Sequence, residues 1–124
     1  MTTTYKQEGK VLQYTAAADI TAGTVLKIGN ILGVALTDIA NGATGPVATE
    51  GVFSAPKVAA AVIAKGESLV WDVSASSGAG AFDGNAATPA TGDVSGAAAF
   101  AWEGAAATTT TLLVKFTGVP GTVT

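Results

Sequence analysis

The residues of this chain that are able to do chemistry are carboxylates, hydroxyls and lysines. Its 124 residues contain nine Asp or Glu and six lysines, but no arginine, histidine or cysteine. Histidine is the usual proton shuttle near neutral pH, and the cysteine thiolate is a common nucleophile and metal ligand. Because both are absent, an enzyme of this sequence would have to use a carboxylate or a lysine as its base. We therefore predict a protein that is not an enzyme and needs no metal or other cofactor.

The stretch FDGN at 82–85 comes nearest to a ligand-binding motif. In a calcium loop that began at Asp83, the fifth and twelfth positions would supply oxygen ligands, but Ala87 and Val94 stand there. The stretch is therefore interpreted as a turn. The glycines of GAGAFDG at 78–84 do not have the spacing of the dinucleotide-binding motif, and no glycine-rich loop ending in Lys-Ser or Lys-Thr occurs.

Charge and hydropathy exclude two further classes of partner. The lysines are scattered singly in a chain whose net charge is −3, whereas nucleic-acid binding requires clustered cations. No run of about 18 apolar residues occurs, so neither a signal peptide nor a membrane span is expected. The sequence predicts a protein made in the cytoplasm that binds neither nucleic acid nor membrane.

Short β-strands separated by glycine turns must position whatever site the chain has. The segment 24–36 places Gly29-Asn30 between two apolar runs, which predicts a hairpin with a two-residue turn. A second turn is expected at Asn41-Gly42, and Pro46 should open the next strand, which runs through 46–54. Alternation in 67–73 predicts that Trp71 points into the core together with its neighbours at 69 and 73.

The C-terminal third contains two more predicted strands. Alternation in 94–104 puts Val94, Ala98, Phe100 and Trp102 on one side of a single strand. In 111–117 it groups three apolar side chains, Leu112, Val114 and Phe116. Trp71 and Trp102 are expected in the core or in a subunit interface, and a stacking platform for sugars or bases is the alternative.

One segment departs from the strand pattern. The alanine-rich residues 55–66, with Pro56 near the start and Gly66 at the end, predict a short helix. Residues 74–91 are rich in Gly, Ser and Ala and predict loops around at most one short strand near Phe82. We find no internal repeat. The predicted fold is a mainly β, single-domain β-barrel or β-sandwich over 10–118, with flexible loops at 74–93, an extended N-terminal arm at 1–9 and a C-terminal tail at 119–124.

Four motifs carry a resemblance to a known family. They are YTAAADI at 14–20, GVALTDIANG at 33–42, EGVF at 50–53 with PK at 56–57, and GESLVWD at 66–72. In this order they resemble a family of small phage proteins that decorate, or cement, the capsid. The resemblance is close over 5–73 and looser over the final TTLLVKF.

The resemblance implies a protein that binds the outer surface of the assembled phage head and stabilises it. Its expected partners are the major capsid protein and further copies of itself, with a trimer favoured over a dimer. An extended N-terminal segment could add a strand to a neighbouring sheet edge. We expect the following residues to contact the capsid or a neighbouring subunit: Tyr5, Lys6, Gln7, Glu8, Val11, Val52 and Phe53. The alternative function is a sugar-binding head or fibre module.

Overall fold

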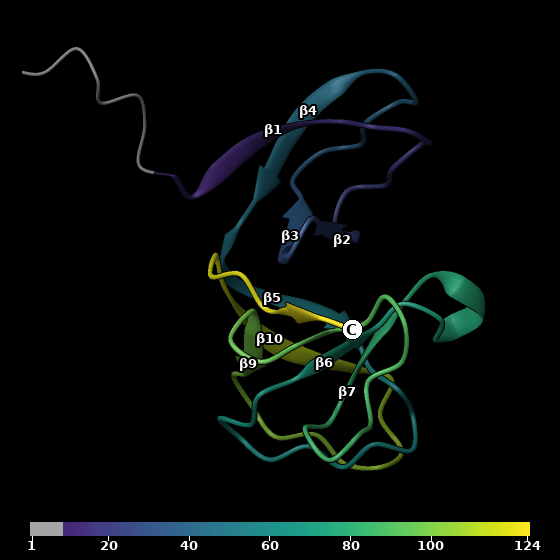
Figure 1. Cartoon of the computed structure of the whole chain (residues 1–124), viewed down its shortest axis with the longest axis vertical. Coiled ribbons are helices and arrows are strands. Elements are labelled where there is room, and N and C mark those ends of the chain that lie inside the picture. The colour runs from purple at the N-terminus through teal and green to yellow at the C-terminus, as the bar shows by residue number, and fades with distance from the viewer. Residues whose placement is uncertain (1–8) are drawn as a thin grey trace, which may run out of the picture.

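The computed structural model describes residues 9–124 and shows a mainly β structure with long turns and loops (Figure 1). Its elements are β1 (Val11–Thr15), β2 (Val25–Ile28), β3 (Ile31–Ala35), β4 (Thr44–Ala48), β5 (Glu50–Pro56), β6 (Val70–Asp72), the 3-10 turn η1 (Ser76–Gly78), β7 (Ala81–Asp83), β8 (Val94–Ser95), β9 (Ala99–Ala101), β10 (Thr111–Thr117) and β11 (Thr122–Val123). The predicted mainly β class is confirmed.

The strands form three antiparallel sheets, and none of them closes on itself. Their orders are β1-β4-β3-β2, β5-β10-β9 and β11-β8-β6-β7. In Figure 1 the first sheet makes the upper half of the molecule, and the other two make the lower half. Open sheets that share a core are consistent with the predicted sandwich rather than with the barrel.

The main core lies where the three sheets meet. A chain of edge-to-face aromatic contacts crosses it from the second sheet to the third. Phe53 contacts Phe116 with ring centroids 5.9 Å apart, Phe116 contacts Phe82 at 5.8 Å, and Phe82 contacts Trp71 at 4.8 Å. Each such pair stabilises the fold by about 0.5–1.5 kcal/mol beyond the burial of its rings. This row of aromatic contacts therefore holds the two sheets together.

The first sheet packs against a hydrophobic core on each of its faces. Val25, Leu32 and Val34 point into the main core. Ala35 and Val47 belong to a second, smaller core on the opposite face. That face is covered by the two connections of the sheet, residues 16–24 and 36–43, which contribute Ala16, Ile20 and Ile39 to the smaller core.

These two connections are copies of one motif, although the sequence analysis found no repeat. Both read Ala-x-x-Asp-Ile-x-x-Gly, with the aspartates at 19 and 38. Ile20 and Ile39 exchange two backbone hydrogen bonds of 2.8 Å. Asp19 Oδ1 accepts from the Asn41 amide and Asp38 Oδ1 accepts from the Ala22 amide, both at 2.8 Å. Each aspartate thus caps a backbone amide of the other copy, and this amide lies three residues beyond the aspartate of that copy. The two caps are reciprocal, as expected for a local two-fold relation.

Several predicted strands are found where the sequence placed them. Ile28 pairs with Ile31 across the two-residue turn at Gly29-Asn30, and Gly29 has a φ of +60°. This glycine supplies the positive φ that the turn needs. Trp71 is buried, as are the three apolar side chains of β10. The short strand predicted near Phe82 is β7.

The helix predicted over 55–66 is wrong. Pro56 ends β5 opposite Thr111, and the amides that follow bond to other segments: Lys57 to Thr110 O at 2.8 Å and Val58 to Phe82 O at 2.9 Å. Further along, Ile63 and Ala105 exchange two backbone hydrogen bonds. The alanines made a helix plausible, but hydrogen bonds to neighbouring strands replace the i to i−4 bonds that a helix would need.

Two strand boundaries also differ from the prediction. Pro46 lies inside β4, opposite Gln13, instead of opening the strand. Its carbonyl accepts from the amide of Leu36, which lies just beyond the end of β3, so its missing N–H interrupts no pairing in the sheet. The segment 94–104 is two strands rather than one. A turn that contains Gly96, with a φ of +87°, separates β8 from β9.

The two ends of the chain were predicted to be an N-terminal arm and a C-terminal tail. The arm predicted over 1–9 lies outside the described residues except for Gly9, whose carbonyl accepts from Thr49 Oγ1 at 3.1 Å. Residues 119–124, set apart as a tail in the sequence analysis, contain β11, which pairs with β8. The Gly121 amide also donates to Asn30 O at 2.7 Å, which links this segment to the hairpin of the first sheet.

Candidate docking surface

The outward face of the sheet β5-β10-β9 carries several exposed apolar side chains. Six large hydrophobic side chains of the described residues are exposed, and three of them lie on this face: Val52 (40% exposed), Leu113 (41%) and Trp102 (45%), the last immediately after β9. Phe100 is half-buried on the same face. We call this surface the outer face.

Strand register sets the outer face in two rows. Lys115 of β10 pairs with Val52 on one side and with Phe100 on the other. In the next row, Leu113 pairs with Ser54, and the Trp102 amide donates to Leu113 O at 2.9 Å. Side chains directly opposite in antiparallel strands lie about 5 Å apart on one face, so these groups form one continuous surface.

The two exposed aromatic rings lie close together. The ring centroids of Phe100 and Trp102 are 6.3 Å apart, with the planes inclined by 41°. The alternation in 94–104 predicted both rings on the side of Val94 and Ala98, which are buried, and this prediction is wrong. The turn after β8 changes the alternation, so Ala99 and Ala101 point inward and the two rings point outward.

The predicted contact residues are divided between different places. Val52 lies on the outer face. Phe53 points to the opposite side of β5, where it packs against the main core. Val11 lies in β1, opposite Ala48, in a different sheet from Val52. Tyr5, Lys6, Gln7 and Glu8 lie outside the described residues.

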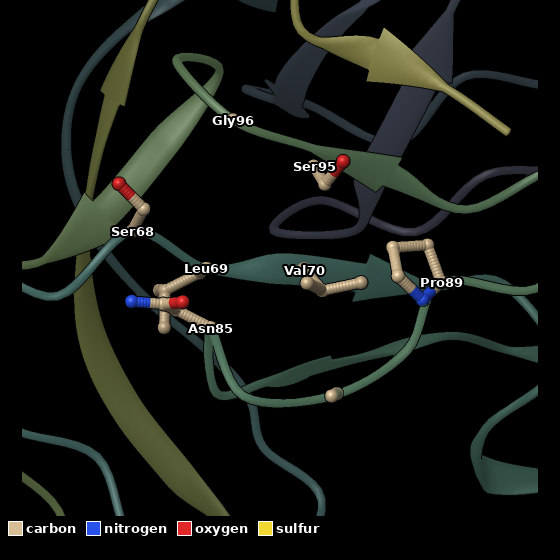
Figure 2. A pocket seen from close by; sticks show the side chains of 8 residues that line it. Ser68, Leu69, Val70, Asn85, Pro89, Ser95 and Gly96 are labelled. Carbon is tan, nitrogen blue, oxygen red and sulfur yellow. The ribbon is translucent and has the colours of Figure 1, made fainter.

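A hollow borders the outer face. It has a volume of about 300 Å³ and is lined by Ser68, Leu69, Val70, Asn85, Ala87, Pro89, Ser95 and Gly96. Figure 2 shows Ser68 and Asn85 at one end and Pro89 at the other, with Val70 of β6 between them. Ser68 pairs with Phe100, so the hollow adjoins the outer face. Its lining carries hydroxyl and amide groups but no charge.

Chemistry-bearing residues are scarce elsewhere in the described chain. Residues 9–124 contain no group of three or more acidic side chains that could hold a metal ion. Asp93 is buried, but its two oxygens accept from the Val73 and Ala90 amides at 3.1 and 2.9 Å. Lys57 is 3% exposed, and its ammonium donates to three backbone carbonyls. Both groups fasten the backbone, so we assign them structural roles.

Of the two tryptophans considered for a sugar-stacking platform, one is not accessible. Trp71 is 4% exposed and packs on Phe82, so it offers no ring to a sugar. Trp102 is accessible, and its neighbours Phe100 and Leu113 are apolar. This setting is typical of a protein-contact surface, because aromatic residues are enriched at the centres of interfaces.

The comparison with known families decides the class of protein. Residues 6–116 match the family model described as phage cement protein. The chain belongs to this family. No curated protein and no solved structure matches the chain. The matched residues include strands of all three sheets, in both the upper and the lower half of Figure 1. In residues 9–124 no helix is both long and apolar enough to cross a membrane.

The outer face could have been found from the sequence only in part. Grouping the inward residues of 111–117 leaves Leu113 on the outward side, but a single exposed apolar residue is common on protein surfaces and does not by itself indicate a docking face. Trp102 could not be added, because its side depends on the turn at Gly96. The pairing of β5, β10 and β9 depends on contacts distant in sequence.

Proposed function

We propose that this cement protein binds the outer surface of the assembled phage head and stabilises it without catalysing a reaction. The observation that carries the proposal is the outer face, a sheet surface on which Val52, Leu113 and Trp102 are all exposed. Burial of apolar area yields about 25 cal/mol per Å², so a shell that covers this face gains affinity from it.

Stabilisation follows from binding alone. A protein that binds the assembled shell and not its separated subunits stabilises the shell by RT ln(1 + [L]/Kd), which is about 2.7 kcal/mol at one hundred times Kd. The acidic chain also suits an outer position, because its net charge of −3 would be repelled by packaged DNA.

The proposal includes two further parts. Residues 1–9, with Tyr5, Lys6, Gln7 and Glu8, add a strand to a sheet edge of a neighbouring subunit or of the major capsid protein. The bound form is a small symmetric oligomer, with a trimer favoured over a dimer. A chain that begins at Lys10 tests the first part, and the mass of the protein in solution tests the second.

The experiment for the main proposal uses undecorated heads of the phage that encodes this chain. Purified protein is added, the bound fraction is measured after sedimentation of the heads, and the temperature of DNA release is recorded. We expect saturable binding and a higher release temperature. A glycan array run in parallel tests the sugar-binding alternative: binding to glycans but not to heads would replace the proposal.

A further inference from the structure

Lys115 is the charged side chain at the centre of the outer face. Its neighbours across the strands are Val52 and Phe100, and its outward neighbours along β10 are Leu113 and Thr117. The ammonium-bearing side chain therefore stands between two apolar side chains, with polar residues in the next row.

The ammonium group of Lys115 has no anionic partner among residues 9–124. The ion pair found in that range joins Lys65 to Glu103 at 4.0 Å, between two well exposed side chains. Glu50 lies on the same face in the next row, where it pairs with Thr117, and it forms no ion pair with Lys115. A solvated cation without a partner is tolerated only while the face is open to water.

Covering the outer face with protein would change this balance. Removing water from an ammonium group is costly unless an anion or several acceptors replace it. Lysine can move its charged end to the rim of an interface, but Lys115 has Val52 and Phe100 on its two sides. A docked partner that is wholly apolar would therefore bury an uncompensated charge.

We infer that the part of the head that docks on the outer face carries a carboxylate opposite Lys115, within an otherwise apolar patch. This inference rests on the proposed function. A second copy that meets the face across a two-fold axis is the poorer occupant, because Lys115 would then lie against its own equivalent. A contact in a trimer has no such axis, so the sedimentation measurement below tests that occupant.

The test measures the affinity of three variants for undecorated heads at two salt concentrations. Lys115→Met keeps the apolar stem and removes the charge, and Lys115→Glu reverses the charge. Lys65→Met is the matched control, because Lys65 is a well exposed lysine that pairs with Glu103. Thermal melts confirm that all three are folded.

We expect the Kd of Lys115→Met for heads to rise by about thirtyfold or more, because loss of the ammonium group leaves the carboxylate of the head unpaired. Lys115→Glu should bind more weakly still, and Lys65→Met should stay within about twofold of the wild type. The wild-type affinity should fall modestly between the two salt concentrations, and that of Lys115→Met should fall less.

Lys115→Met that binds heads as tightly as the wild type would overturn the inference and leave the proposed function standing. Wild-type protein that does not bind heads at all would overturn both. Sedimentation of the free variants supplies the remaining outcome: if Lys115→Met changes the oligomeric state and not the head affinity, the outer face joins copies of the chain and the inference fails.

Discussion

Leu113 and Trp102 lie side by side on the outer face, joined by a 2.9 Å hydrogen bond from the Trp102 amide to the Leu113 carbonyl. Both side chains are more than two-fifths exposed although they are large and apolar. Neighbouring exposed apolar groups form a patch, and such patches mark interaction sites more often than isolated exposed residues do. The pair is therefore the natural place to separate head binding from folding.

Replacing Leu113 by serine should weaken head binding and leave the fold intact. The side chain contributes little to the core, so we expect the free energy of unfolding to change by about 0.5 kcal/mol or less. The Kd for heads should rise about tenfold, since a central apolar contact is lost. Leu36→Ser is the matched control, because Leu36 is 43% exposed but lies after β3 in the first sheet. Equal losses of affinity in the two variants would mean that the outer face has no special role.

Gly80 should tolerate alanine much less well than Gly23 does. Both have a positive φ, +91° and +87°, so alanine meets similar backbone strain at either position. A Cβ at Gly80 would overlap the indole of Trp71, whereas one at Gly23 would meet open space. We expect Gly80→Ala to cost about 1–3 kcal/mol more than Gly23→Ala in urea unfolding. Equal costs would show that the Trp71 ring has room to move.

Lys57 should be essential for stability. Its ammonium donates to Val58 O at 2.7 Å, Thr109 O at 3.0 Å and Ala59 O at 3.2 Å, and the residue is buried. Lys57→Met leaves three carbonyls without their donor, and we expect a loss of about 3 kcal/mol in the free energy of unfolding. The exposed Lys65→Met serves as control and should change stability by less than about 0.5 kcal/mol. A more stable Lys57→Met would mean that burying the charge costs more than its hydrogen bonds contribute.

The two copies of the Asp-Ile motif should respond alike to mutation. Asp19→Ala and Asp38→Ala each remove one backbone cap, and we expect each to cost about 1 kcal/mol. Asp→Asn at either position keeps an oxygen acceptor and should cost less. Because the caps flank the Ile20–Ile39 bridge, the double alanine variant should deviate from additivity. Strictly additive costs in chemical denaturation would argue that the two connections are held independently.

The sequence predicted the fold best where local signals and core packing agree. The Gly29-Asn30 hairpin combines a turn dipeptide with apolar runs on both sides, and β10 alternates over its whole length. The prediction failed at 55–66, where alanine favours a helix. The backbone hydrogen bonds of this segment instead go to residues 105–110 and to Phe82. Such distant partners leave no trace in local periodicity, so tertiary contacts override propensity there.

The repeat was missed for a different reason. Only Ala, Asp, Ile and Gly are shared between 16–24 and 35–43, so the signal is short. Its meaning appears once Asp19 is seen to cap Asn41 and Asp38 to cap Ala22. The candidate site likewise depends on contacts distant in sequence. Val52 was predicted as a contact residue, whereas Trp102 and Lys115 became part of the outer face only through strand pairing.

The measurement that tests the central claim most directly compares wild-type protein with the Leu113→Ser/Trp102→Ser double variant on undecorated heads. Both are titrated onto heads, and occupancy and the temperature of DNA release are recorded on the same samples. We predict that the wild type saturates the heads and raises the release temperature. The double variant, with an unchanged melting temperature of its own, should bind at least about a hundredfold more weakly and give no protection at the same concentration. A folded double variant that decorates and protects the heads as the wild type does would contradict the claim that this face binds the shell.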